Sequence, residues 1–164
     1  MKKNANTLLD EFTIRGWDSN FLDAVSVLGK KKVRRSAAYY ELVDPTYAFS
    51  CRNEGDVKLL YDNDFIPIGT CSNGDFIVVF VAKTSGDFVP GSVYLLSHGY
   101  GWEEAIDNPS ILPQITRLLA SNTDAFLKLA SDKQSGLPFD YFDGNDKPYR
   151  PPYMQKKKKK ARKK

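Results

Sequence analysis

The sequence has few of the residues that bind metals, form disulfides or act as catalytic bases. Its 164 residues include two cysteines, Cys51 and Cys71, and one histidine, His98. The cysteines lack the C-x-x-C spacing of a zinc or redox site, and no acidic residues have the spacing of a calcium loop. We therefore expect two buried thiols, no metal site and no cofactor.

Long apolar runs are also missing from the chain. The longest run, residues 76–82, holds seven residues, whereas a membrane helix needs about 18. The N-terminus begins with positive charge, but Asp10 and Glu11 follow where a secretory signal would need apolar residues. We expect a protein that does not span a membrane and stays in the cytoplasm.

The charge is divided unevenly along the chain, which carries a formal net charge of +4. Residues 156–164 hold eight positive charges and no negative one, so the remainder has a formal charge of −4. A second basic cluster occupies residues 30–35, and residues 36–155 hold 8 basic and 16 acidic groups. The folded body is therefore acidic, and its field favours a cationic partner.

Two helices are predicted near the N-terminus. Apolar residues recur there at three- and four-residue spacing, at Leu8, Leu9 and Phe12 and again at Phe21, Leu22, Val25 and Leu28. Asp18 or Ser19 can cap the second helix, which we expect to end near Gly29.

Strands are expected from Tyr39 onward. Residues 53–56 have strong turn chemistry, residues 57–61 are predicted as a short edge strand, and residues 65–69 as a strand in which Pro67 marks an edge or a bulge. The Asn-Gly turn at residues 72–75 leads into a core strand at residues 76–82. Residues 91–97 form the next antiparallel strand of this prediction.

The rest of the chain is predicted from its turn-forming, polar and helix-capping residues. The polar residues 103–109 indicate a surface connection, residues 111–119 fit more than one structure, and residues 121–130 form a capped terminal helix. Residues 136–155 are expected to lie over the surface, and the lysine run to be disordered. The pattern predicts one α+β domain at residues 1–150, in which helices flank a mostly antiparallel sheet, and a basic tail at residues 151–164.

Three stretches, in this order and spacing, resemble the SUKH superfamily. They are FIPIG followed by SNGDF at residues 65–76, GSVYLLSH at residues 91–98 and ASNTDAFL at residues 120–127, and the likeness is clearest over residues 65–130. The superfamily includes a yeast regulator of cell-wall glucan synthesis and bacterial toxin-immunity proteins. The resemblance implies an α+β protein-binding module whose partner in bacteria is often a toxin.

A cationic toxin would suit the acidic body, because such a surface both steers and covers a basic partner. Carboxylates beside an aromatic residue are common in interfaces, and the candidate contacts are Trp102, Glu103, Glu104 and Asp107. The alternative for this segment is a solvated loop with Trp102 folded into the core.

Catalysis is not expected, and no catalytic residue is assigned. His98 is the only candidate base for Cys71, and no nucleophile motif surrounds either residue. A histidine at a strand end more often makes a backbone hydrogen bond.

The rival hypothesis is a nucleic-acid- or ribosome-associated protein that contacts phosphates through its basic clusters. The candidate residues are Lys30, Lys31, Lys32, Arg34, Arg35, Lys156, Lys157, Lys158, Lys159 and Lys160. Against specific recognition, the chain shows neither a basic recognition helix nor a basic strand with interleaved aromatics.

Overall fold

The computed structural model describes residues 7–30, 40–71, 74–83, 86–99 and 101–131. Five strands form one antiparallel sheet in chain order. They are β1 (Tyr40–Leu42), β2 (Phe65–Cys71), β3 (Phe76–Phe80), β4 (Val93–Leu96) and β5 (Thr116–Ala120). The predicted α+β class with an antiparallel sheet is therefore confirmed.

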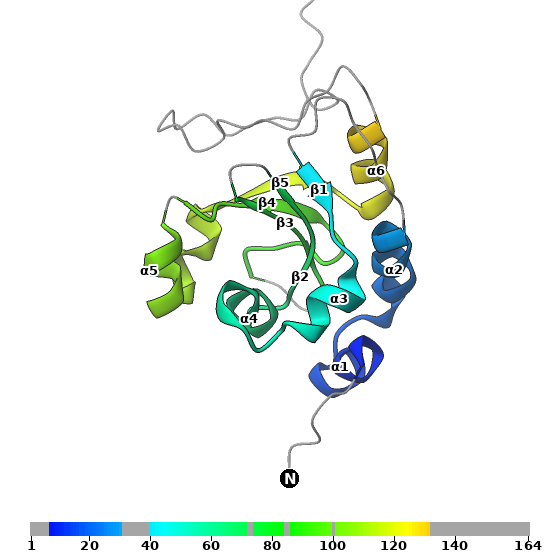
Figure 1. Ribbon diagram of the computed structural model, residues 1–164, viewed down its shortest axis with the longest axis horizontal. Helices are drawn as coiled ribbons and strands as arrows, with labels where there is room; N and C mark the ends of the chain where they lie inside the picture. The colour runs from blue at the N-terminus through cyan, green and yellow to red at the C-terminus, as the bar shows by residue number, and fades with distance from the viewer. Residues whose placement is uncertain (1–6, 31–39, 72–73, 84–85, 100, 132–164) are drawn as a thin grey trace, which may run out of the picture.

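Helices lie on both sides of this sheet, with α2 and α6 side by side at one side and α5 at the other (Figure 1). The helices are α1 (Leu8–Arg15), α2 (Leu22–Lys30), α3 (Pro45–Ser50), α4 (Gly55–Asp62), α5 (Trp102–Asp107) and α6 (Thr123–Ser131). Short 3-10 helices η1 (Ser19–Phe21) and η2 (Pro109–Gln114) precede α2 and β5.

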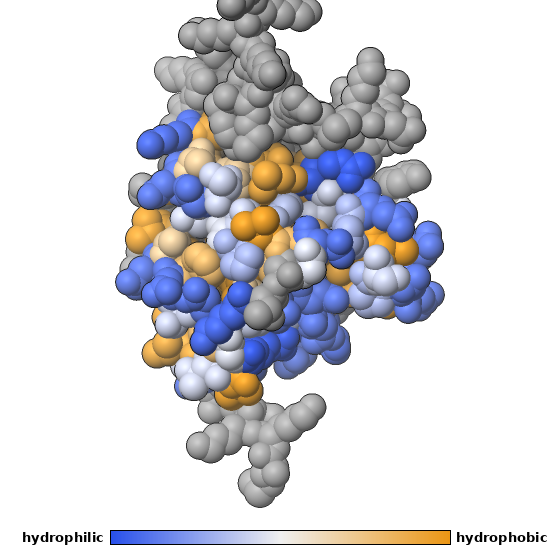
Figure 2. Space-filling view, turned by 180° about the vertical axis from the view of Figure 1, so that it is seen from behind, coloured by the Kyte–Doolittle hydropathy of each residue, from blue (hydrophilic) through white to orange (hydrophobic). Residues whose placement is uncertain are grey.

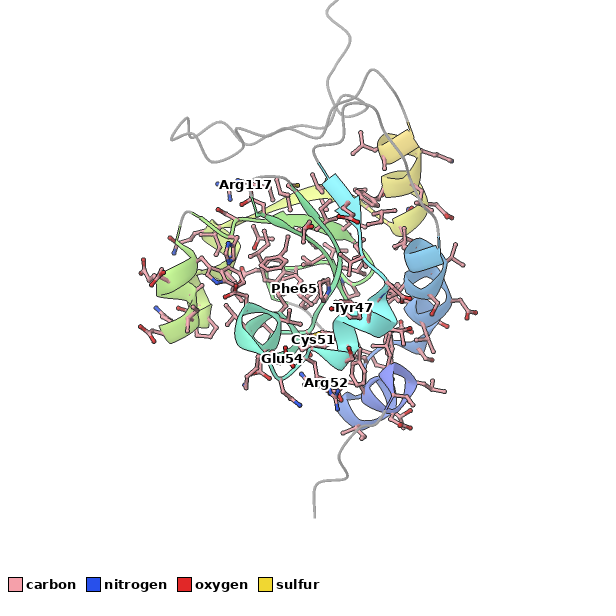
Figure 3. All side chains as sticks on the ribbon, in the orientation of Figure 1. Tyr47, Cys51, Arg52, Glu54, Phe65 and Arg117 are labelled. Atoms are coloured by element: carbon pink, nitrogen blue, oxygen red, sulfur yellow. The ribbon has the colours of Figure 1, made fainter. Side chains whose placement is uncertain are left out.

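The central strand β3 explains why the longest apolar run is continuous. Successive side chains of a strand point to opposite faces, and both faces of β3 are covered. Ile77 and Val79 pack in the cluster that includes α2 and α6, whereas Val78 and Phe80 pack in the cluster that includes α5. Phe65 lies in the interior on this second side (Figure 3), with its ring centroid 5.3 Å from that of Phe80.

Helix caps occur where the sequence predicts them. The Asp18 side chain accepts from the backbone N–H of Asn20 at the start of η1, which leads directly into α2. The Asn122 side chain accepts from the backbone N–H of Ala125 at 2.8 Å and caps α6. These bonds satisfy N–H groups that have no partner within the helix.

The hairpin between β2 and β3 also follows the prediction. The register shifts between Pro67 and Gly69, so Pro67 lies at a bulge. Beyond the hairpin turn, Gly74 has a φ of 93° and its N–H donates to the carbonyl of Cys71 at 2.9 Å. The strand at residues 91–97 is β4, which pairs with β3.

Three predicted segments are wrong. Residues 45–50, where strands are expected from Tyr39 onward, form the helix α3, which Asp44 caps. Residues 57–61 are not an edge strand but lie in α4, because Leu60 and Tyr61 are buried while Lys58 and Asp62 pair one helical turn apart at the surface. Residues 103–109 are not simply a connection, since most of them belong to α5, and η2 follows. The open segment 111–119 divides between η2 and β5.

Candidate partner-binding surface

The helix α5 begins at a glycine that the packing requires. Gly101 has a φ of 74°, and an added Cβ there would lie 2.6 Å from Cγ2 of Ile115. A left-handed φ and such a close approach both exclude a side chain. The turn at Gly101 therefore fixes the position at which α5 begins and the direction in which Trp102 points.

Trp102 points into the protein. Its side chain is 4% exposed, and its ring centroid lies 5.4 Å from that of Phe76 and 5.2 Å from that of His98. The indole Nε1 donates to Oδ1 of Asp56 at 2.8 Å. Trp102 thus packs between α5 and the sheet, in agreement with the alternative that folds this side chain into the core. It presents little surface to a partner.

Asp56 joins three parts of the chain. Its Oδ1 accepts from Trp102, and its Oδ2 lies 2.8 Å from Nε2 of His98, which follows β4. Burial alone would raise the pKa of Asp56, but the hydrogen bonds from Trp102 and His98 outweigh it and lower the pKa. The carboxylate therefore stays ionised while it holds α4, β4 and α5 together.

The outer side of α5 is acidic and partly apolar. Glu103, Glu104 and Asp107 are exposed, and Ile106 among them is 53% exposed. Glu103, Ile106 and Asp107 follow three- and four-residue spacing and so share one helix face. Among the described residues, no salt bridge involves any of these three carboxylates. The lobe that α5 forms is mostly hydrophilic, with a small apolar area (Figure 2).

The structure thus divides the four predicted contact residues between two roles. Glu103, Glu104 and Asp107 lie at the surface, and Trp102 anchors their helix. Ile106 and Asp56 were not among the predicted contacts. If residues 102–107 are assumed to be helical, the three-residue spacing from Glu103 places Ile106 on the same helix face. No local signal identifies Asp56 as a contact of Trp102, because the two residues are 46 positions apart in the sequence.

Among the described residues, Cys71 and His98 are not hydrogen-bonded to each other, so the pair weighed as a nucleophile and its base is not assembled. Cys71 is 8% exposed, and burial, with a smaller contribution from Asp75, raises the pKa of its thiol to about 12. The ring of His98 bonds the carboxylate of Asp56, not a backbone group as expected. The second thiol, Cys51, is only partly buried, so the expectation of two buried thiols holds for Cys71 alone.

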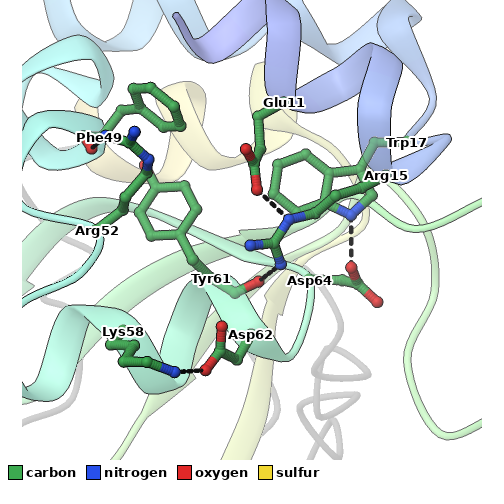
Figure 4. Close-up of polar contacts among 9 residues, drawn as sticks. All are labelled: Glu11, Arg15, Trp17, Phe49, Arg52, Lys58, Tyr61, Asp62 and Asp64. Atoms are coloured by element: carbon green, nitrogen blue, oxygen red, sulfur yellow. Dashed lines mark hydrogen bonds and ion pairs between the residues drawn. The ribbon is translucent and has the colours of Figure 1, made fainter. Parts of the chain in front are cut away.

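A second polar cluster, at the junction of α1 and α4, is structural (Figure 4). Buried Glu11 pairs with Arg15, whose guanidinium also donates to the carbonyl of Tyr61. The indole of Trp17 donates to Asp64, which stands just before β2. These contacts fasten α1 to the segment that leads into the sheet.

The described residues are strongly acidic as a set. They include seven lysines and arginines against sixteen aspartates and glutamates, a formal charge of −9. Of the predicted polyanion contacts, only Lys30 falls within them, at the end of α2. Lys31, Lys32, Arg34, Arg35 and Lys156 to Lys160, like the segment 136–155 and the tail, lie outside the described residues.

Within the described ranges, no three His, Cys, Asp or Glu side chains are grouped to hold a metal ion. No helix in the same ranges has the length and apolar character needed to cross a membrane. Comparisons with protein-family models, with curated proteins and with solved structures found no match.

Proposed function

We propose that this chain is a non-catalytic protein-binding domain of the SUKH type, which docks a cationic protein on the outer face of α5. The face consists of Glu103, Glu104, Ile106 and Asp107. The observation that carries the proposal is that Glu103, Glu104 and Asp107 share one short helix with the exposed Ile106 and have no salt bridge within the described residues.

A rigid support favours binding at this face. Trp102 is buried, and Asp56 bonds its indole at 2.8 Å, so α5 is held before a partner arrives. Preorganisation lowers the entropy cost of association. Carboxylates at the rim then accelerate encounter with a basic surface and discriminate against acidic proteins.

In biological terms, we propose an immunity protein that acts in the cytoplasm and neutralises a cognate cationic toxin, or a related regulator. A toxin that acts on nucleic acids carries a basic cleft, and an acidic helix can cover such a cleft. The resemblance over residues 65–130 supports this class of partner, and the acidic body of the structure fits it.

A protection assay tests the proposal. Cells in which the gene is deleted are grown with parent cells, and the wild-type chain, an α5 variant and a control variant are each returned to them. The α5 variant is Glu103→Gln, Glu104→Gln and Asp107→Asn. The control, Asp23→Asn, Asp87→Asn and Asp124→Asn, removes the same charge from exposed positions on α2, a loop and α6.

The wild-type chain and the control variant are expected to restore growth, and the α5 variant is expected to fail while folding normally. Growth that does not change on deletion would contradict immunity. Binding of RNA or ribosomes that disappears when the tail lysines are replaced, without any protein partner, would favour the nucleic-acid hypothesis instead.

A further inference from the structure

We propose that the basic C-terminal segment of this same chain, residues 151–164, docks on the outer face of α5. The inference concerns the same face as the proposed function but does not depend on it, because the segment can bind α5 whatever the external partner is.

Charge is the first reason for this pairing. Residues 156–164 carry eight positive charges and no negative one, whereas the described residues have a formal charge of −9. Charges that are exposed and farther apart than about 8 Å are largely screened at physiological salt. The attraction is therefore effective mainly where lysines meet carboxylates directly.

The free carboxylates of α5 are the second reason. Elsewhere, Glu11 pairs with Arg15, and Asp62 pairs with Lys58. Glu103, Glu104 and Asp107 lie within one six-residue helix, are all exposed, and have no salt bridge among the described residues. Three carboxylates within six residues are therefore available on this helix to pair with lysines.

The nearest basic side chain along the chain, Arg117, does not neutralise this face. Its guanidinium donates to the carbonyls of Gln114 at 2.8 Å and Thr116 at 3.0 Å. Figure 3 shows Arg117 beside the sheet rather than on α5. Both of these hydrogen bonds go to backbone carbonyls, and neither goes to a carboxylate of α5.

Apolar complementarity is the third reason. Ile106 is 53% exposed on the same helix as the carboxylates, and Tyr153 and Met154 precede the lysine run, separated from it by Gln155. A segment that presents an aromatic and a methionine next to lysines matches a face that presents an isoleucine next to carboxylates. This combination favours α5 over acidic positions that have no apolar neighbour.

The covalent connection permits the contact. The 24 residues between Ser131, at the end of α6, and Lys156 can span at most roughly 80 Å when extended. A domain of this size is about 35 Å across, so every face lies within reach. Attachment raises the local concentration of the segment to the order of millimolar, so weak ion pairs are sufficient.

The test uses the full chain labelled with ¹⁵N. Amide signals of α5 and the indole signal of Trp102 are compared between the wild-type chain and a variant in which Lys156 to Lys160 are glutamine. We expect the chemical-shift differences between the two chains to be confined mainly to α5. Because salt screens exposed ion pairs, these differences should diminish as the salt concentration is raised from roughly 50 to 500 mM. Shifts absent from α5, or spread evenly over the acidic surface, would overturn the proposal.

Peptide binding measures the same contact in trans. A fluorescent peptide of residues 150–164 is titrated into the full chain with the five lysines replaced. Three exposed ion pairs predict that Glu103→Gln, Glu104→Gln and Asp107→Asn together weaken binding about ten-fold, and that Asp23→Asn, Asp87→Asn and Asp124→Asn weaken it less than about three-fold. Equal losses in both variants would show attraction to net charge alone and would reject the α5 site.

A reciprocal charge exchange guards against unfolding of either variant. The substitutions Glu103→Lys, Glu104→Lys and Asp107→Lys together should abolish the shifts, and Lys156→Glu through Lys160→Glu in the same chain should restore them. Carbodiimide cross-linking of mixed ¹⁴N and ¹⁵N chains then distinguishes binding of the tail within one chain from binding between two chains. Links within one isotope support the proposal, and mixed-isotope links show binding between copies and overturn it.

These outcomes are independent of the proposed function. If the tail does not bind α5 but the α5 variant still loses protection, only this inference fails. If the tail binds α5 but deletion of the gene has no effect on growth, only the immunity function fails.

Discussion

The indole Nε1 of Trp102 donates to Oδ1 of Asp56 at 2.8 Å, which joins the first residue of α5 to the first turn of α4. The other oxygen of Asp56 is 2.8 Å from His98. Since the side chain of Asp56 is 42% exposed and that of His98 37%, solvent reaches the pair while the indole remains buried. The orientation of the candidate docking helix therefore depends on one half-exposed carboxylate.

Replacement of this carboxylate is expected to loosen α5. Asp56→Ala removes both acceptors and should lower the free energy of unfolding by about 1–2 kcal/mol, because hydrogen bonds to charged groups are stronger than neutral ones but exposure weakens them. Urea denaturation measures the loss. Asp62→Asn, on the same helix but in an exposed pair with Lys58, is the control and should cost at most about 0.5 kcal/mol. Equal losses would contradict a special role for Asp56.

Acid should weaken the same contact. The pKa of Asp56 is lowered in the folded protein, so its stabilisation is fully present above the unfolded value of about 3.9 and is lost as pH falls through the folded value. The difference in unfolding free energy between wild type and Asp56→Asn should shrink as pH falls below about 5. The measurement should extend to about pH 2, roughly two units below the pKa of the unfolded state. A free-energy difference that does not change over this range would refute the predicted pH dependence.

Gly101 should tolerate no side chain. Gly101→Ala combines a φ of 74° with a Cβ 2.6 Å from Ile115, and we expect a loss of about 1–3 kcal/mol in unfolding free energy. Gly86→Ala is the matched control, because Gly86 has no atom within 4 Å of an added Cβ and no positive φ. Thermal and urea unfolding of both variants provide the comparison, and a neutral Gly101→Ala would show that the turn can adjust.

The two thiols should differ in reactivity. The pKa of Cys71 is about 12 and its side chain is buried, whereas Cys51 is partly exposed. Iodoacetamide at about pH 8 should therefore alkylate Cys51 first and Cys71 only after unfolding, because the thiolate is the reactive form. Mass spectrometry of the native chain and of Cys51→Ser checks this order. Rapid modification of Cys71 in folded Cys51→Ser would contradict the buried environment.

Tyr61 is expected to be replaceable by phenylalanine. Its hydroxyl is buried and has no hydrogen-bond partner among the described residues, and burial raises its pKa. Since an unsatisfied buried hydroxyl costs about 1–3 kcal/mol, Tyr61→Phe should be neutral or stabilise the fold by about 1 kcal/mol. Glu11→Gln, which breaks a buried ion pair with Arg15, should instead destabilise it. A marked loss in Tyr61→Phe would mean that the hydroxyl has a partner.

Local patterns predict much of this fold. The apolar run that begins at Phe76 and the capped helix at residues 121–130 are each specified within a few residues, and each is present as β3 and α6. The errors at residues 57–61 and 103–109 have a common cause. Short segments fit helix, strand or loop equally well, and burial of Leu60 or Trp102 against distant residues decides among them.

Periodicity, capping and charge are properties of neighbouring residues, so the sequence was sufficient to predict β2, β3 and β4, the capped helices and an acidic body beside a basic tail. Packing between distant segments turns Trp102 inward, places Asp56 against it, and leaves Glu103, Glu104, Ile106 and Asp107 at the surface. Those contacts join residues 46 positions apart, and side chains so distant in the chain meet only when both faces of the sheet are packed.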